Sequence, residues 1–144
     1  MDETARAPVH SFATVGRFQD MDAGGVLFFP RFFALFHDAN LDFLAARGID
    51  FPAALAGQRW LAPIVHAEAD LKAPVRFGDA LVVELTAVTL GQTSLTIDYL
   101  LRGAGEGEAV RATGRTVQVF IDPATFQKRS VPADVRAALA PGPG

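Results

Sequence analysis

The amino-acid sequence predicts an α+β fold in which a curved antiparallel sheet is wrapped around one long helix. A segment that begins at Pro30 is apolar on almost every side of a helix, and such a helix is usually buried on most sides. Several later segments alternate apolar and polar residues with the period of half-buried strands. Short glycine-bearing turns separate these segments, as is typical of antiparallel sheets.

The first elements follow from local signals. Residues 10–18 are expected to form a strand, and residues 19–25 form a polar loop that contains glycine. The helix is expected to run from Pro30 to about Arg47. Proline suits the first helical turn because its missing N–H costs nothing there. Gly48 then follows as a typical residue at a helix end.

The strands after the helix have apolar residues at every second position. They are expected over residues 65–71, 81–87, 95–101 and 109–121, and a short final helix is expected over residues 132–139. Because these strands follow one another with tight turns between them, we expect an antiparallel meander in which each strand lies beside the next.

Length and composition are those of one globular domain that spans residues 1–144, with flexible tails at residues 1–9 and 141–144. The net charge of −3 argues against binding of nucleic acid by bulk electrostatics. No segment reaches the ~18 consecutive apolar residues of a membrane helix. Residues 1–8 lack the apolar core of a signal peptide, so the cytoplasm is the expected location.

The densest group of candidate functional residues lies just before the long helix. It holds two carboxylates, those of Asp20 and Asp22, and an adjacent pair of glycines. Asp-x-Asp before Gly-Gly is also ordinary turn chemistry. A loop that folds back at the glycines would bring a carboxylate to the start of the helix, where it could act as a base or a nucleophile.

The start of the helix could polarise the substrate carbonyl on which that carboxylate acts. Helix N-termini offer unpaired N–H groups and the positive end of a dipole, which polarise a carbonyl group. The N–H groups near Phe28 and Phe29 are the candidates, because Pro30 has none.

Residues 20–30 read Asp-Met-Asp-Ala-Gly-Gly-Val-Leu-Phe-Phe-Pro and precede an aromatic-rich helix. This motif resembles the hot-dog-fold acyl-CoA thioesterases, and most of all the 4-hydroxybenzoyl-CoA thioesterase group. Residues 62–65 and 75–79 resemble further segments of that family. The resemblance implies a hot-dog fold, hydrolysis of an aromatic or medium-chain acyl-CoA without metal or cofactor, and a homodimer or homotetramer with its sites at subunit interfaces.

The resemblance also assigns roles to single residues. The family's catalytic aspartate falls on Asp22, as nucleophile or general base, and its carbonyl-polarising backbone N–H falls on Phe29. Asp20 matches a position that is often acidic, and we interpret it as structural. The benzoyl-type enzymes hold the CoA phosphates with basic residues in a turn that here reads Thr-Leu-Gly-Gln, at residues 89–92. That phosphate site therefore does not carry over.

Further substrate contacts are predicted from residue type. The aromatic candidates would line an acyl pocket or pack in the core, and His37 would line the same pocket or be a core histidine. Arginines are candidates for the phosphates of CoA. The residues in question are Phe28, Phe33, His37 and Trp60, with Arg76 first among the arginines Arg76, Arg102, Arg111 and Arg115.

Two other functions stay open at this point. A hot-dog hydratase or dehydratase would need a histidine paired with a carboxylate, and His37 beside Asp38 is the nearest such pair. A non-catalytic module would bind acyl-CoA without turnover. His66, Glu68 and Asp70 alternate on one strand face, where a metal could bind, but ion pairs or subunit contacts are the favoured interpretation.

Overall fold

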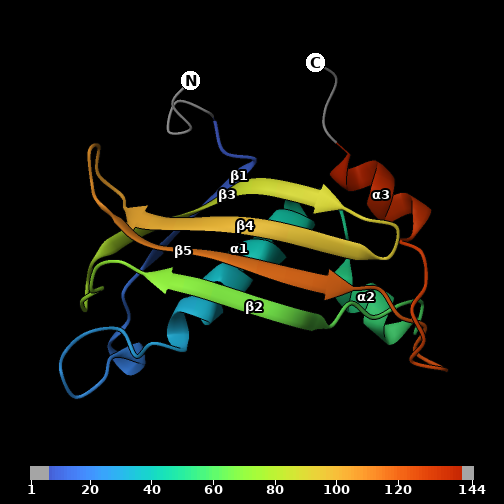
Figure 1. Cartoon of the computed structure of the whole chain (residues 1–144), viewed down its shortest axis with the longest axis horizontal. Helices are drawn as coiled ribbons and strands as arrows, with labels where there is room; N and C mark the ends of the chain where they lie inside the picture. The colour runs from blue at the N-terminus through green and yellow to red at the C-terminus, as the bar shows by residue number, and fades with distance from the viewer. Residues whose placement is uncertain (1–6, 141–144) are drawn as a thin grey trace.

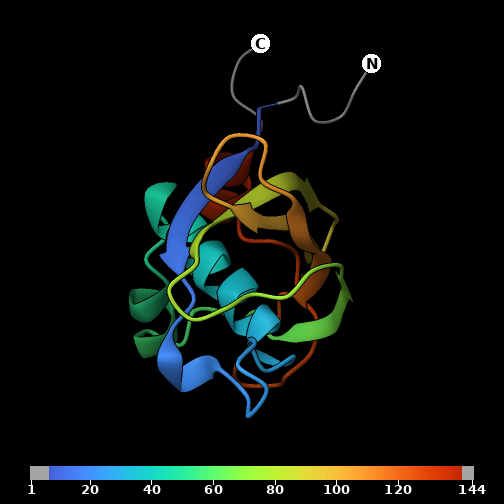
Figure 2. The same cartoon turned by 90° about the vertical axis from the view of Figure 1, so that its left-hand side faces the viewer.

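The computed structural model describes residues 7–140. A five-stranded antiparallel sheet curves around helix α1, as the two views in Figures 1 and 2 show. The strands are β1 (His10–Val15), β2 (Ile64–Leu71), β3 (Ala80–Leu90), β4 (Ser94–Gly103) and β5 (Val110–Val119). The helices are η2 (Phe18–Asp20, a 3-10 turn), α1 (Arg31–Ala46), α2 (Phe51–Ala56) and α3 (Ala133–Leu139). The predicted α+β class with an antiparallel sheet is confirmed.

The order of the strands corrects the predicted meander. It is β1-β3-β4-β5-β2, so β3, β4 and β5 follow one another but β2 lies at the far edge beside β5. Strand β1 pairs with β3 at the other edge. The chain crosses the sheet through α1 between β1 and β2, and it therefore arrives at the opposite edge.

Strand β2 also corrects the expected burial pattern. Its residues are all exposed except Ala69, which is half-buried, and Val65 is 61% exposed. An edge strand has a neighbour on one side only, so the apolar face predicted for residues 65–71 stays open.

The core lies between α1 and the sheet. Phe36 of α1 is fully buried and stacks on Tyr99 of β4, with ring centroids 4.9 Å apart. Gly114 of β5 lies under the same ring, where a Cβ atom would collide with Phe36. Burial raises the pKa of Tyr99 to about 12, so its phenol is neutral and shares a hydrogen bond with Thr116 at 2.8 Å. This close approach fixes α1 on the sheet.

Other boundaries differ in detail. Strand β1 ends at Val15 rather than at residue 18, because Phe18 begins η2. Helix α2 was not predicted; Asp50 caps it by accepting the N–H of Ala53 at 3.0 Å. The expected tails lie outside the described residues except for residues 7–9, where the N–H of Val9 donates to a carbonyl of β3. No helix within residues 7–140 is long and apolar enough to cross a membrane.

Candidate active site

The loop between η2 and α1 folds back on itself at the Gly-Gly pair. Met21 and Leu27 form an antiparallel bridge, and the N–H of Asp22 donates to the carbonyl of Val26 at 2.8 Å. Gly25 turns the chain with a φ of +82°, a conformation that glycine adopts at little cost. Asp22 therefore lies beside the turn at the tip of a narrow hairpin, and the second arm of this hairpin leads into α1.

The carboxylate of Asp22 is exposed, and only one of its oxygens is engaged. Oδ1 accepts the N–H of Gly24 at 2.8 Å and that of Val26 at 3.4 Å. Within residues 7–140, Oδ2 has no hydrogen-bond partner. The hairpin thus orients the carboxylate through one oxygen and leaves the other oxygen available.

One N–H group at the start of α1 is available as well. The N–H of Phe28 donates to the carbonyl of Asp20 at 2.9 Å, and Pro30 has no N–H. Among the described residues, the N–H of Phe29 meets no acceptor. The predicted pair of N–H groups near the helix start is therefore reduced to that of Phe29.

Asp20 anchors this arrangement. Its carboxylate is largely buried and lies 3.3 Å from Nε of Arg17 and 3.7 Å from Nε of Arg31. Its backbone carbonyl accepts a hydrogen bond from the N–H of Phe28. Asp20 thus ties η2 to the first turn of α1 and gives Arg31 a partner that the sequence did not indicate.

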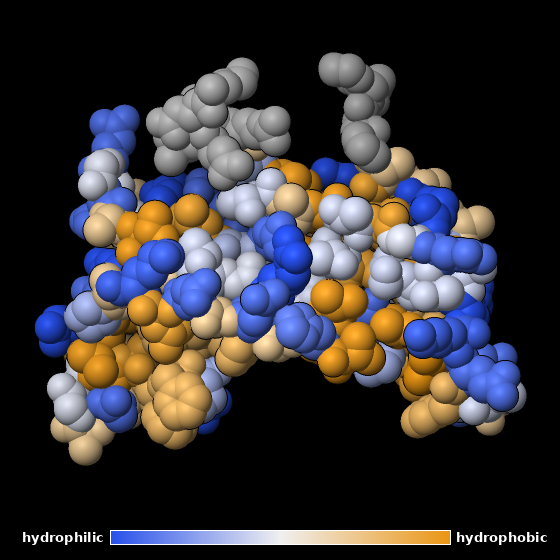
Figure 3. Space-filling model, in the orientation of Figure 1, coloured by the Kyte–Doolittle hydropathy of each residue, from blue (hydrophilic) through white to orange (hydrophobic). Residues whose placement is uncertain are grey.

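A groove of about 320 Å³ runs beside Phe29. Residues of the loop and of α1 form one wall, and the segment that follows β2 forms the other. Its lining is apolar apart from a single lysine and consists of Val26, Leu27, Phe29, Phe32, Leu71, Lys72, Ala73, Pro74 and Val75. Apolar surface also gathers at lower left in Figure 3. The segments around the groove expose four aromatic side chains, those of Phe18, Phe28, Phe29 and Phe77.

Arg111 of β5 holds the second wall in place. Its guanidinium donates to the carbonyl of Pro74 at 3.0 Å and to the carboxylate of Asp79 at 2.8 Å. The hydrogen bond from Arg111 to Asp79, together with that from the N–H of Arg76 at 2.9 Å, keeps the pKa of Asp79 below its ordinary value of 3.8. The N–H of Leu27 donates to the carbonyl of Val75 and joins the two walls.

The structure separates the four predicted arginines into two kinds. Arg102, Arg111 and Arg115 are each paired with a carboxylate. Arg76 is exposed, and no carboxylate of residues 7–140 lies within ion-pair distance of its guanidinium. Its backbone bridges to Val26, next to the Asp22 hairpin.

The other predicted contact residues are not gathered at the groove of one chain. Phe28 is 46% exposed and its ring lies 5.4 Å from that of Phe29. Phe33 packs edge-on against Phe36, outside the groove lining. Trp60 is 3% exposed and packs against aromatic rings near α2, which lies at the opposite end of the sheet from the loop in Figure 1.

His37 does not form the pair that a hydratase would need. It is half-buried, and its Nδ1 atom is buried without a hydrogen-bond partner among the described residues. Asp38 is exposed, and no hydrogen bond or ion pair joins the two side chains.

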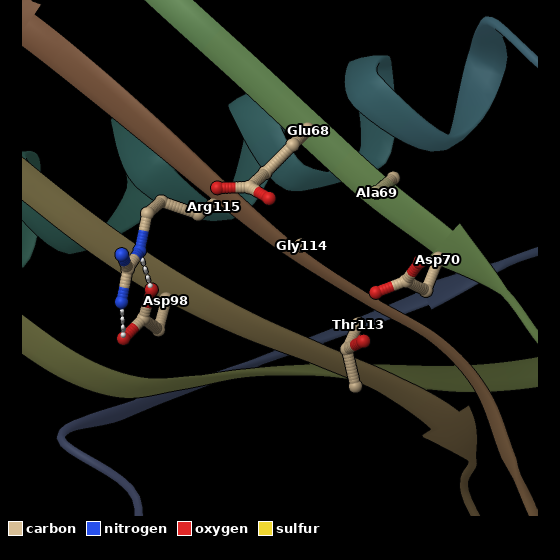
Figure 4. A pocket seen from close by; sticks show the side chains of 7 residues that line it. All are labelled: Glu68, Ala69, Asp70, Asp98, Thr113, Gly114 and Arg115. Carbon is tan, nitrogen blue, oxygen red and sulfur yellow. Dashed lines mark hydrogen bonds and ion pairs between the residues drawn. The ribbon is translucent and has the colours of Figure 1, made fainter.

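A second, shallow depression lies on the outer face of the sheet, away from α1 (Figure 4). Arg115 donates two hydrogen bonds to Asp98 there, at 2.6 and 3.1 Å, and Glu68 also accepts from His66 at 3.3 Å. Arg115, one of the four predicted arginines, is thus paired with Asp98 there, and the other predicted contact residues, Phe28, Phe33, His37, Trp60 and Arg76, do not line this depression.

Sequence reasoning missed Lys72. It lies directly after β2 and enters the groove lining between Leu71 and Ala73. No motif marks it, and the only available signal was its position just before the family-like segment at residues 75–79.

Comparison with known proteins agrees with this fold. The chain is 33% identical over 124 residues to a 1,4-dihydroxy-2-naphthoyl-CoA hydrolase of Synechococcus elongatus, covering 85% of this chain and 89% of that protein. It is 32% identical to a protein of the same name from Trichodesmium erythraeum, over 89% of this chain and 93% of that protein.

Solved structures show the same similarity. A 1,4-dihydroxy-2-naphthoyl-CoA thioesterase from Synechocystis superposes with a TM-score of 0.85 at 25% identity, over 90% of this chain and 93% of the other. A gentisyl-coenzyme A thioesterase gives a TM-score of 0.78 at 26% identity, over 90% and 99%. The expected hot-dog fold and the prediction of a thioester hydrolase are thereby confirmed. The family model for the thioesterase-like superfamily matches residues 17–139, and the chain belongs to that superfamily.

Proposed function

We propose that this protein hydrolyses the thioester of an aromatic or medium-chain acyl-CoA to the free acid and CoA. Membership of the thioesterase-like superfamily supports the reaction. The similar proteins are named for hydroxyaryl thioesters of CoA, which favours the aromatic part of that range. The apolar groove beside Phe29 suits such an acyl group.

One observation carries the proposal: the loop that supplies Val26, Leu27 and Phe29 to the groove lining also carries two unengaged groups, a hydrogen-bond donor and a carboxylate oxygen. The Phe29 N–H, without an acceptor in residues 7–140, is suited to hold the oxygen of the thioester carbonyl. Oδ2 of Asp22 is suited to act on the carbonyl carbon or on a water molecule. Val26 connects them, because it binds Oδ1 of Asp22 and lines the groove together with Phe29.

Two mechanisms of thioester hydrolysis are compatible with this arrangement. As a general base, Asp22 takes a proton from water while the water oxygen attacks the carbonyl carbon, and the resulting tetrahedral intermediate then collapses with cleavage of the C–S bond and release of the CoA thiolate. As a nucleophile, its carboxylate attacks directly, expels the CoA thiolate and forms a mixed anhydride that water then opens. In both routes negative charge develops on the carbonyl oxygen, next to the N–H of Phe29.

The quaternary structure belongs to the same proposal. We infer a homodimer formed through β2, either alone or as half of a homotetramer, because this edge strand exposes Ile64, Val65 and Leu71. Unpaired edge strands of this kind readily add a further strand. In an antiparallel pair of β2 strands, the start of one strand lies beside the end of the other. The segment of the partner that precedes β2 would then approach the groove of this chain.

The test is release of free CoA from a panel of thioesters that spans short, medium, long and hydroxyaryl acyl groups. Wild type and Asp22→Asn are assayed side by side. Turnover of an aromatic or medium-chain thioester that is lost in the variant is the expected result. Saturable binding with no turnover of any thioester would instead indicate a binding module, and hydration of an enoyl-CoA would indicate a hydratase.

A further inference from the structure

Lys72 is the only charged residue among those of residues 7–140 that line the groove beside Phe29. Its side chain is exposed, and none of the described carboxylates lies within ion-pair distance of its ammonium group. The chain as a whole is acidic, with a net charge of −3. A lysine left unpaired at an apolar groove in an acidic protein is therefore well placed to bind an anionic part of a ligand.

Three carboxylates of the surrounding segments, those of Asp79, Asp70 and Asp22, do not form ion pairs with Lys72. Asp79 forms an ion pair with Arg111, with 2.8 Å between Nη1 and the carboxylate oxygen. Asp70 lines the depression on the outer face of the sheet and stands opposite Thr113 in the strand register. Asp22 keeps its carboxylate within its own hairpin.

The backbone at Lys72 is held firmly. The N–H groups of Lys72 and Ala73 both donate to the carbonyl of Arg111, at 2.8 and 3.1 Å. The guanidinium of the same arginine holds Pro74. Because the main chain is fixed, a ligand has only the lysine side chain to order, which lowers the cost of binding.

Arg76 adds a second exposed cation to the same segment, four residues further along. None of the carboxylates of residues 7–140 lies within ion-pair distance of its guanidinium, and its charge contributes to the lowered pKa of Asp79. Arg76 directly follows Val75, which lines the groove, and we call Lys72 and Arg76 together the cationic rim. Two exposed cations match a ligand with several negative charges better than they match a neutral acyl group. In an acyl-CoA, such charges reside on the phosphate groups of the carrier.

We propose that the cationic rim binds the phosphates of CoA, with Lys72 as the residue that distinguishes the CoA carrier from shorter thiols. This inference rests on the proposed function. It locates the phosphate contacts on the connection between β2 and β3, in place of the turn between β3 and β4, which carries no basic residue in this chain.

The experiment compares two thioesters with the same acyl group, one of CoA and one of N-acetylcysteamine, which has no phosphate. Loss of one charge-assisted contact predicts a KM for the CoA thioester about tenfold higher in Lys72→Met, with kcat preserved. The N-acetylcysteamine thioester is expected to show no change, and Lys72→Arg to restore the wild-type KM. Added salt is expected to raise the wild-type KM for the CoA thioester more than that of Lys72→Met.

The other lysine of the chain provides a matched control. Lys128 is exposed on the connection between β5 and α3, and Lys128→Met is expected to keep the wild-type KM. An equal rise with Lys128→Met would overturn the proposal, because any loss of positive charge would then suffice. An equal loss on both thioesters would also overturn it, since Lys72 would then act on the acyl group or on the fold.

A binding measurement separates this inference from the proposed function. Calorimetric titration with free CoA is expected to give a dissociation constant about tenfold weaker for Lys72→Met than for wild type. If no thioester is hydrolysed but this difference is found, the proposed function fails and the cationic rim stands. If thioesters are hydrolysed and CoA binds both proteins equally, only the cationic rim fails.

Discussion

Three consecutive residues at the start of α1 differ in what their backbones can donate. The N–H of Phe28 is taken by the carbonyl of Asp20, and Pro30 has no N–H. Phe29 lies between them with an N–H that meets no acceptor among the described residues. An unpaired donor costs little while it faces water, and it gains strength when a substrate excludes water from it.

The role of this N–H can be separated from that of the Phe29 ring by two substitutions. Phe29→Ala keeps the N–H and removes the ring, whereas Phe29→Pro removes the N–H. Loss of one oxyanion donor is expected to lower kcat by about 10²–10³ in Phe29→Pro. Phe29→Ala is expected to retain kcat within roughly tenfold and to change mainly KM, because the ring lines the groove.

Circular dichroism and thermal unfolding of both variants provide the control for folding. Equal losses of kcat in two well-folded variants would assign the effect to the ring and remove the N–H from the mechanism.

At the scale of elements, the connection between β2 and β3 depends on the contact between Arg111 and Asp79. Hydrogen bonds from Arg111 and from the Arg76 N–H lower the pKa of Asp79. A carboxyl group whose pKa is lower in the folded state stabilises the fold at pH values above its ordinary pKa of 3.8. That contribution is lost as the pH falls through the lowered pKa of the folded state.

Asp79→Asn is therefore expected to reduce the free energy of unfolding by about 1–2 kcal/mol at pH 7. The difference from wild type should shrink as the pH falls below 3.8. Urea unfolding at several pH values measures both effects. Asp134→Asn is the control, because the ion pair of Asp134 with Arg59 is exposed and 4.0 Å long; a difference that does not vary with pH would contradict this account.

The elements themselves were predictable where their patterns are long. Helix α1 was expected to within one residue at each end, since its apolar positions extend over four turns and Pro30 and Gly48 flank it. Helix α2 was not predicted because it has only six residues, and one of them is a proline. The burial of β2 was predicted wrongly because apolar alternation looks the same in an edge strand and a central strand.

The site was predictable in part for a related reason. Asp22 and Phe29 are close in sequence, on the loop that leads into α1, so a local motif was enough to propose both. Lys72 lines the same groove as Phe29 because β2 lies at the edge of the sheet beside β5. No local sequence pattern predicts this strand order.

At the scale of the whole molecule, the predicted acyl-pocket residues lie far apart within one chain. Phe29 is at one end of α1, and Trp60 packs near α2 beyond the other end (Figure 1). An antiparallel dimer through β2 would bring such opposite ends together, and it would cover the apolar residues that β2 exposes.

This arrangement predicts that a charge on β2 disrupts both assembly and activity. Val65 is 61% exposed on the edge strand, and lysine at an edge opposes the addition of another strand. Val65→Lys is expected to be monomeric in sedimentation equilibrium and to lose most of its thioesterase activity, while its circular dichroism is unchanged. A fully active monomer would contradict the dimeric site, and a dimer with wild-type affinity would contradict the β2 interface.

The most direct test of the central claim is kcat for Asp22→Asn at saturating concentration of the best thioester. Asp38→Asn is the matched control, because Asp38 is an exposed aspartate of α1 with no partner among residues 7–140. We predict that kcat falls on the order of 10²–10⁴ in Asp22→Asn and stays at the wild-type value in Asp38→Asn. Wild-type turnover by a folded Asp22→Asn protein would contradict the claim that this carboxylate carries the reaction.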